Sequence, residues 1–159
     1  MTPDRKQLLK TWIAALLWIG LIAIESTDTF SAEHTSRFLY PLLHFLMGLD
    51  PAGFEVVHHY IRKCGHFVGY FTLSFFLFRA WRATLRLPWG PRWALRWATI
   101  AFFMSALVAS LDEWHQTFIP SRTGSFSDVM LDSFAALTAQ AVIFIFLTWR
   151  PRRMSMASD

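Results

Sequence analysis

The chain has few of the residues that build a soluble surface or a covalently braced fold. Its 159 residues include one cysteine, Cys64, and only 16% are charged, whereas 54% are hydrophobic and 17% aromatic. A single cysteine excludes an intramolecular disulfide and a thiolate cluster for metal, so we expect Cys64 to be a small packing residue in a helix. So much apolar surface in a chain of this length indicates an integral membrane protein.

The chain also lacks an uninterrupted apolar run of the roughly 20 residues that a helix needs to cross a bilayer. Charge-free runs occur at 11–24, 64–78, 97–111 and 133–149. Each is too short, so polar flanking residues must enter the membrane with them. We predict an all-α integral membrane protein, one domain over residues 1–159, with four transmembrane helices near 8–27, 62–81, 95–114 and 129–149.

Basic residues gather in three segments that this topology places on one side. Of the 15 Lys and Arg, 11 lie in residues 5–10, 79–96 and 150–153. The positive-inside rule therefore predicts a multi-pass protein of the cell (inner) membrane with both termini cytoplasmic. Residues 25–63 and 112–132 then face outward and hold nine of the 11 acidic residues. The net charge of +4 is an orientation signal, and no separate basic patch indicates a nucleic-acid partner.

The first apolar segment has two interpretations. A basic start followed by a short apolar run is also typical of a cleaved signal peptide. The bulky Phe30 lies where a cleavage site would need a small residue, and loss of the segment would leave an odd number of helices. We therefore expect a retained signal anchor.

The first outer loop carries helix signals of its own. Residues 35–48 are apolar but too short to cross, which indicates an interfacial or re-entrant helix. Asp50 and Pro51 are typical of an N-cap and a first helical turn. We expect this helix to continue through Ile61 into the second span. A cytoplasmic turn is predicted at 87–91, where two prolines flank a Trp-Gly pair.

Polar residues recur at helical spacing at the outer ends of three predicted spans. They are Lys63, His66 and Tyr70 in the second; Asp112, Glu113 and Gln116 in the third; and Ser125, Asp128 and Asp132 in the fourth, where Ala135, Ala136 and Ala139 continue the same face. Polar groups at membrane depth are costly and usually functional. We therefore predict a buried polar pocket that opens outward.

The pocket's composition suits phosphate or pyrophosphate chemistry. Lys63 and Arg122 would hold the anion. Glu113 or His66 would act as general base or acid, with Asp128 orienting them. The further predicted substrate contacts are Gln116, Tyr70, Asp112, His115 and Asp132.

Each assignment has an alternative. Asp128 and Asp132 could simply favour the positive end of a helix, Lys63 and Arg122 could only neutralise buried acids, and Glu25 could join the cluster or be a solvated flank. We expect His58 and His59 to be surface residues. A divalent metal on Glu113, Asp128, Asp132 and His66 is a further alternative without a tight ligand motif, so the cofactor is unknown. Cys64 and Ser121 lack the supporting spacing of a nucleophile.

Two segments resemble the signature of the VanZ-like family of small bacterial membrane proteins. Residues 61–70 are similar to its RK..H...Y pattern, and residues 112–132 to its DE..Q....P.R.....D...D/N pattern. The resemblance covers about residues 10–148 and implies a multi-span protein of the cell envelope, linked to teicoplanin resistance in the founding member. Ser121 and the pair Ala135-Ala136 replace glycines that the family pattern expects.

The leading functional hypothesis is an enzyme that acts on an envelope lipid or lipid-linked phosphate. One alternative is a non-catalytic binder or shield of an envelope precursor or lipoglycopeptide drug, and another is a small transporter, which would need an oligomer to form a pathway. The expected partners are membrane lipids or a lipid-linked envelope precursor.

Overall fold

The computed structural model describes residues 3–86 and 92–149. These residues form five α-helices and one short 3-10 helix, with no strand in the described ranges. The elements are α1 (Pro3–Glu25), η1 (Asp28–Phe30), α2 (Ala32–Met47), α3 (Pro51–Thr84), α4 (Leu95–Gln116) and α5 (Phe126–Trp149). The all-α prediction is therefore confirmed. The predicted turn at 87–91 and the C-terminal basic segment at 150–153 lie outside the described residues.

Three of the described helices are long and apolar enough to cross a membrane. They are α1 from Arg5 to Glu25, α4 and α5. Large apolar side chains cover their outer surfaces, among them Leu17, Phe103 and Phe134. The multi-span prediction is thus confirmed for three helices. The fourth predicted span lies within α3, which has 34 residues but also carries charged side chains.

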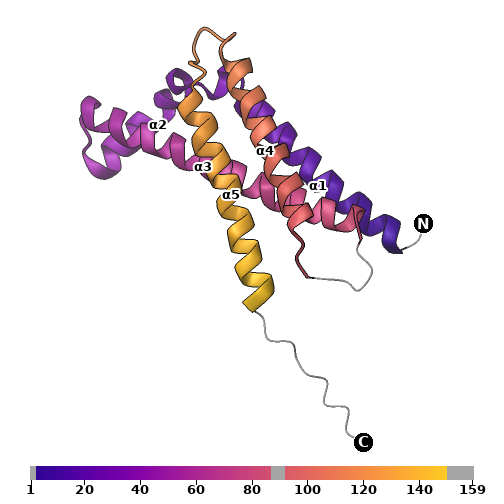
Figure 1. Cartoon of the computed structure of the whole chain (residues 1–159). Helices are drawn as coiled ribbons and strands as arrows, with labels where there is room; N and C mark the ends of the chain where they lie inside the picture. Colours follow the sequence, from indigo (N-terminus) through magenta and orange to yellow (C-terminus); the bar gives the residue numbers. More distant parts are fainter. Residues whose placement is uncertain (1–2, 87–91, 150–159) are drawn as a thin grey trace, which may run out of the picture.

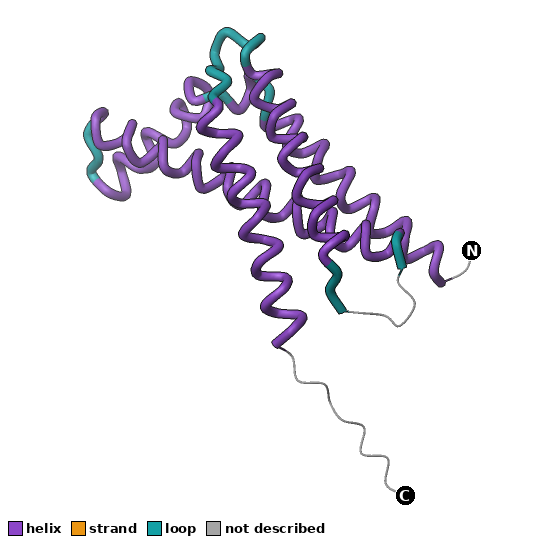
Figure 2. The backbone as a smooth tube through the Cα atoms, viewed as in Figure 1, coloured by secondary structure: helices purple, strands orange, loops and turns teal. Residues whose placement is uncertain are grey.

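The long helices meet around α3. In Figure 1, the C-terminal ends of α1 and α4 and the N-terminal end of α5 gather at the top, while α3 crosses the three helices below. α3 packs against α1, α4 and α5, whereas α1 and α4 make few direct contacts. Figure 2 shows the loop that joins α4 to α5 closing the top of this arrangement. The outer ends of the predicted spans are therefore adjacent in space.

Small residues allow α5 to approach α3 closely. Ala135, Ala136 and Ala139 are fully buried on one face of α5, which confirms the small-residue face predicted from the sequence. Ser74 Oγ donates a hydrogen bond to the Ala136 carbonyl at 3.0 Å, and Gln140 Nε2 donates to Ser74 Oγ at 2.7 Å. These bonds satisfy buried polar groups across a close helix contact.

The hairpin of α2 and α3 follows the capping rules. The left-handed backbone of Gly48, with φ of 66°, ends α2, and Asp50 accepts the Gly53 amide at 2.9 Å to begin α3, with Pro51 in its first turn. The predicted continuous helix from residue 51 into the second span is confirmed. Phe38 and Phe45 of α2 are 81% and 85% exposed, as expected for a helix lying at a membrane surface.

Two expectations about this region are wrong. His58 is not a surface residue but is only 3% exposed, stacked on Phe54 and 3.0 Å from Thr35 Oγ1 through Nε2. The reason is that α2 folds back over the first turns of α3. Cys64 is exposed rather than packed, because it lies on a face of α3 that no described helix covers.

A larger side chain at Ala136 should separate α3 from α5. We expect Ala136→Leu to destabilise the protein by about 1–3 kcal/mol, as overpacking of tight contacts does. Thermal unfolding in detergent measures this effect. The matched control is Ala141→Leu, because Ala141 is exposed on the same helix. Equal unfolding temperatures for both variants would contradict the close α3–α5 contact.

Candidate functional site

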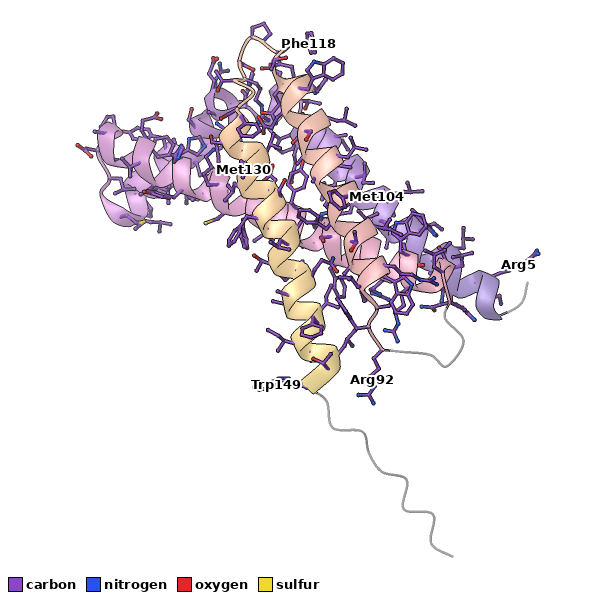
Figure 3. All side chains as sticks on the ribbon, viewed as in Figure 1. Arg5, Arg92, Met104, Phe118, Met130 and Trp149 are labelled. Atoms are coloured by element: carbon purple, nitrogen blue, oxygen red, sulfur yellow. The ribbon has the colours of Figure 1, made fainter. Side chains whose placement is uncertain are left out.

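Residues from three helices and one loop converge where α4, α5 and α3 meet. α3 supplies Lys63, His66 and Tyr70, α4 supplies Asp112, Glu113 and Gln116, α5 supplies Asp128 and Asp132, and the α4–α5 loop supplies Arg122. Figure 3 labels Phe118 in this loop, at the end of the molecule opposite to Arg92 and Trp149. The polar stripes read from the sequence thus face one another.

Lys63, His66 and Tyr70 of α3 each pair with an acid from another helix. Lys63 Nζ forms an ion pair with Asp128 Oδ1. His66 Nδ1 lies 3.3 Å from Asp132 Oδ2. One turn further along the helix, the Tyr70 hydroxyl donates to Asp112 at 3.0 Å. The three pairs connect α3 to α5 and to α4 along one side of the helix.

Glu113 is held by the backbone of the α4–α5 loop. It is 4% exposed, and its Oε2 accepts the Ser125 amide at 2.8 Å. The loop reaches α4 because residue 124 is glycine: a Cβ there would lie 2.3 Å from the Glu113 carbonyl oxygen and 2.6 Å from Thr117 Cγ2. Gly124 therefore fixes the distance between Ser125 and Glu113.

Arg122 anchors the same loop to the end of α1. Its side chain is 8% exposed and donates to the carbonyls of Glu25 and Thr27, the latter at 2.9 Å. Burial lowers the pKa of the Arg122 guanidinium, and the positive charge of Arg62 lowers it further, yet a guanidinium stays protonated at neutral pH. Arg122 forms no ion pair with an acid of the described residues.

Two further contacts join the loop and α4 to the first turns after α1. The Ser121 hydroxyl donates to Asp28 Oδ1, so the serine that replaces the family glycine makes a contact that glycine could not. His115 Nδ1 lies 3.1 Å from Ser26 Oγ. His115 thus belongs to the α1–α4 contact and lies beside the carboxylate cluster.

The acids retain binding capacity. The buried oxygens Asp112 Oδ1, Glu113 Oε1 and Asp132 Oδ1 have no hydrogen-bond partner within residues 3–86 and 92–149. Native structures rarely leave buried polar atoms unpaired, and those that remain mark strained, catalytic or ligand-binding positions. The cluster is therefore not a closed network of salt bridges.

A small cavity of about 30 Å³ lies beside the cluster. His66, Tyr70, Asp112 and Gln116 line it, together with Glu25. A neighbouring groove of about 450 Å³ runs between α1 and α4, with walls mainly of Ile, Leu, Val and Ala side chains. Ile22, Ser26 and Asp112 line both spaces. The cavity and the apolar groove are therefore adjacent and share these three residues in their walls.

The structure assigns positions to all ten predicted site residues. Gln116, Tyr70, His66 and Asp112 line the cavity, and His115 lines the neighbouring groove. Glu113, Asp128 and Asp132 lie in the adjacent cluster, and the two predicted cations, Lys63 and Arg122, make internal contacts. Sequence reasoning did not select Arg62, Gly124 or the Ser125 amide. Arg62 precedes Lys63 in the motif, so the signal for it was present.

The model of the VanZ/LLP1 family matches residues 11–147, which include every residue of the cluster and cavity. No curated protein and no solved structure shows a significant match. The match covers most of the chain and includes both motif segments. This chain belongs to the VanZ/LLP1 family.

Proposed function

We propose that this protein is an enzyme that acts on an envelope lipid or a lipid-linked phosphate from the outer side of the membrane. The observation that carries the proposal is the adjacency of a small cavity lined by polar side chains and an apolar groove, which share Ile22, Ser26 and Asp112 in their walls. A lipid has the same division into a polar head and an apolar chain. Its chain would lie between α1 and α4, and its head group beside Asp112 and His66.

Arg62 is the best candidate for holding the head group's negative charge. Lys63 is paired with Asp128, and Arg122 donates to backbone carbonyls, although its Nε has no hydrogen-bond partner among the described residues. The Arg62 side chain has no ion pair or hydrogen bond with the described residues. Its positive charge lowers the pKa of Arg122, so the two side chains interact electrostatically. It lies one turn from His66 on α3, at the i, i+4 spacing, and guanidinium groups bind phosphate in a bidentate manner.

Glu113 and His66 are the proposed proton-transfer groups. Glu113 is desolvated and has one oxygen without a partner, and the His66 ring is oriented by Asp132. A carboxylate and an imidazole in a water-poor cavity are the usual general acids and bases. In this proposal Asp132 orients His66, a role predicted for Asp128 in the sequence analysis.

The alternative is a protein that binds an amphiphile without chemistry, such as an envelope precursor or a lipoglycopeptide drug. The same groove and cavity would accommodate its acyl chain and polar part. Binding needs the shape of the pocket, whereas catalysis also needs a group that transfers a proton. Variants that keep shape and remove only the titratable group therefore separate the two functions.

We propose that α3 is a fourth span and that the cavity end faces outward. The labelled Arg5 and Arg92 lie away from the α4–α5 loop in Figure 3, as the positive-inside rule requires for cytoplasmic ends. Single cysteines at Ser36 and Thr123, with Cys64 replaced, should react with an impermeant maleimide in intact cells. A cysteine at Leu85 should react only after lysis. If only the cysteine at position 85 reacted in intact cells, the protein would have the opposite orientation.

Glu113→Gln and Arg62→Gln should each lower activity by at least about 100-fold while the protein remains at normal abundance, because both changes keep side-chain size and remove a titratable or charged group. The measurement is lipid mass spectrometry of cells that lack the gene and carry each variant. We expect the lipid changes of the deletion to persist in both variants.

The matched controls are Glu55→Gln and Arg37→Gln, at exposed positions outside the cavity; both should restore the wild-type lipid profile. Full restoration by Glu113→Gln would exclude the proposed proton transfer. Partial restoration would favour the binder.

A further inference from the structure

We infer that His66, Glu113 and Asp132 form a binding site for one divalent transition-metal ion, Mn²⁺ or Zn²⁺. The three side chains come from α3, α4 and α5, and each offers one ligand atom within 4.8 Å of the other two. Ligands bound to such an ion at about 2.0–2.2 Å lie roughly 3–4 Å apart. Small side-chain rotations would therefore complete the coordination without moving the helices.

The charges of the cluster call for a cation. Lys63 neutralises Asp128, and Arg122 is held by backbone carbonyls. Asp112, Glu113 and Asp132 then surround one imidazole, and the charge of Arg122 acts on Asp112 and Glu113 from beyond ion-pair distance. Three carboxylates in a desolvated site repel one another, and burying uncompensated charge costs several kcal/mol. A divalent ion removes most of this imbalance.

Unpaired oxygens provide the second, independent observation. Asp132 is 0% exposed and Glu113 is 4% exposed, yet Oδ1 of the first and Oε1 of the second lack partners in the described part of the chain. Their other oxygens are fixed, one beside His66 and one by the Ser125 amide. Carboxylates anchored through one oxygen and free at the other are pre-oriented as ligands.

The donor set selects the class of metal. Two carboxylate oxygens and one imidazole nitrogen suit Mn²⁺ and Zn²⁺ better than Ca²⁺ or Mg²⁺, which take mainly oxygen ligands. The role of the ion rests on the proposed function: it would present positive charge to a phosphate head group in the adjoining cavity. The existence of the site does not rest on that function, because metal binding is measured without any substrate.

The test uses the full-length, tag-free protein in detergent, stripped with a chelator and then titrated with Mn²⁺. Electron paramagnetic resonance should count one bound Mn²⁺ per chain, and its spin-echo modulation should show one directly coordinated imidazole nitrogen. Mn²⁺ should also raise the unfolding temperature, since it binds only the folded chain. These readouts need no variant, so they stay decisive if substitutions prevent folding.

His66→Ala and Asp132→Asn should each weaken Mn²⁺ binding by at least about tenfold. The matched control is His59→Ala, because His59 is exposed on the same helix outside the cluster. Absence of bound Mn²⁺ and Zn²⁺ in the wild type, or binding without a coordinated imidazole, would overturn the inference. Either result would leave the proposed lipid activity standing, while metal binding without any lipid change in cells would instead overturn that activity.

Discussion

The crowding of Asp112, Glu113 and Asp132 around one imidazole is the constraint on which the rest of this structure depends. Ionised carboxylates at the ends of membrane helices are expensive, so each must be held by a specific group. Tyr70 holds Asp112, the Ser125 amide holds Glu113, and His66 faces Asp132. Those three contacts require α3, α4 and α5 to meet closely at one end.

The packing elsewhere provides this close approach. Buried alanines let α5 lie against α3, and Gly124 lets the α4–α5 loop touch the end of α4. Arg122 fastens the loop to the end of α1, which leaves α1 and α4 joined at that end and separated by the apolar groove along their length. The contacts that hold the acids thus lie beside an apolar groove.

The cations divide into two roles. Lys63 and Arg122 make internal contacts that hold the arrangement together, with Nε of Arg122 left over. Within the described residues, Arg62 has no ion pair or hydrogen bond, and one oxygen each of Asp112, Glu113 and Asp132 has no hydrogen-bond partner. In a purely structural salt-bridge network, the cations and the carboxylate oxygens would all be paired with one another.

Much of the fold followed from the sequence because helical periodicity is a local signal. The apolar runs predicted α1, α4 and α5, the Asp50-Pro51 pair predicted the start of α3, and the 3- and 4-residue spacings placed the polar residues on facing sides. Pairing could not be predicted in the same way. The sequence offers Lys63 four acids in residues 112–132 and does not indicate which one it pairs with. No local signal indicated that Arg122 donates to the backbone carbonyls of Glu25 and Thr27.

His58 was misjudged for a similar reason, since only the return of α2 over α3 buries it. The cavity and groove depend on the spacing of α1 and α4, which no motif encodes. The burial of His58 and the position of the cavity and groove are therefore set by tertiary contacts, which the local sequence pattern does not specify.

The most direct measurement is the thermal unfolding of Asp132→Asn in detergent with a chelator present. Asn keeps the shape and an acceptor for His66 while it removes one of three crowded charges. If the acids are retained for function at a cost in stability, this variant unfolds at a higher temperature than the wild type. Its free energy of unfolding should then be larger by about 1–3 kcal/mol. Unfolding at a lower temperature by a similar amount would show that Asp132 is a structural ion-pair partner instead.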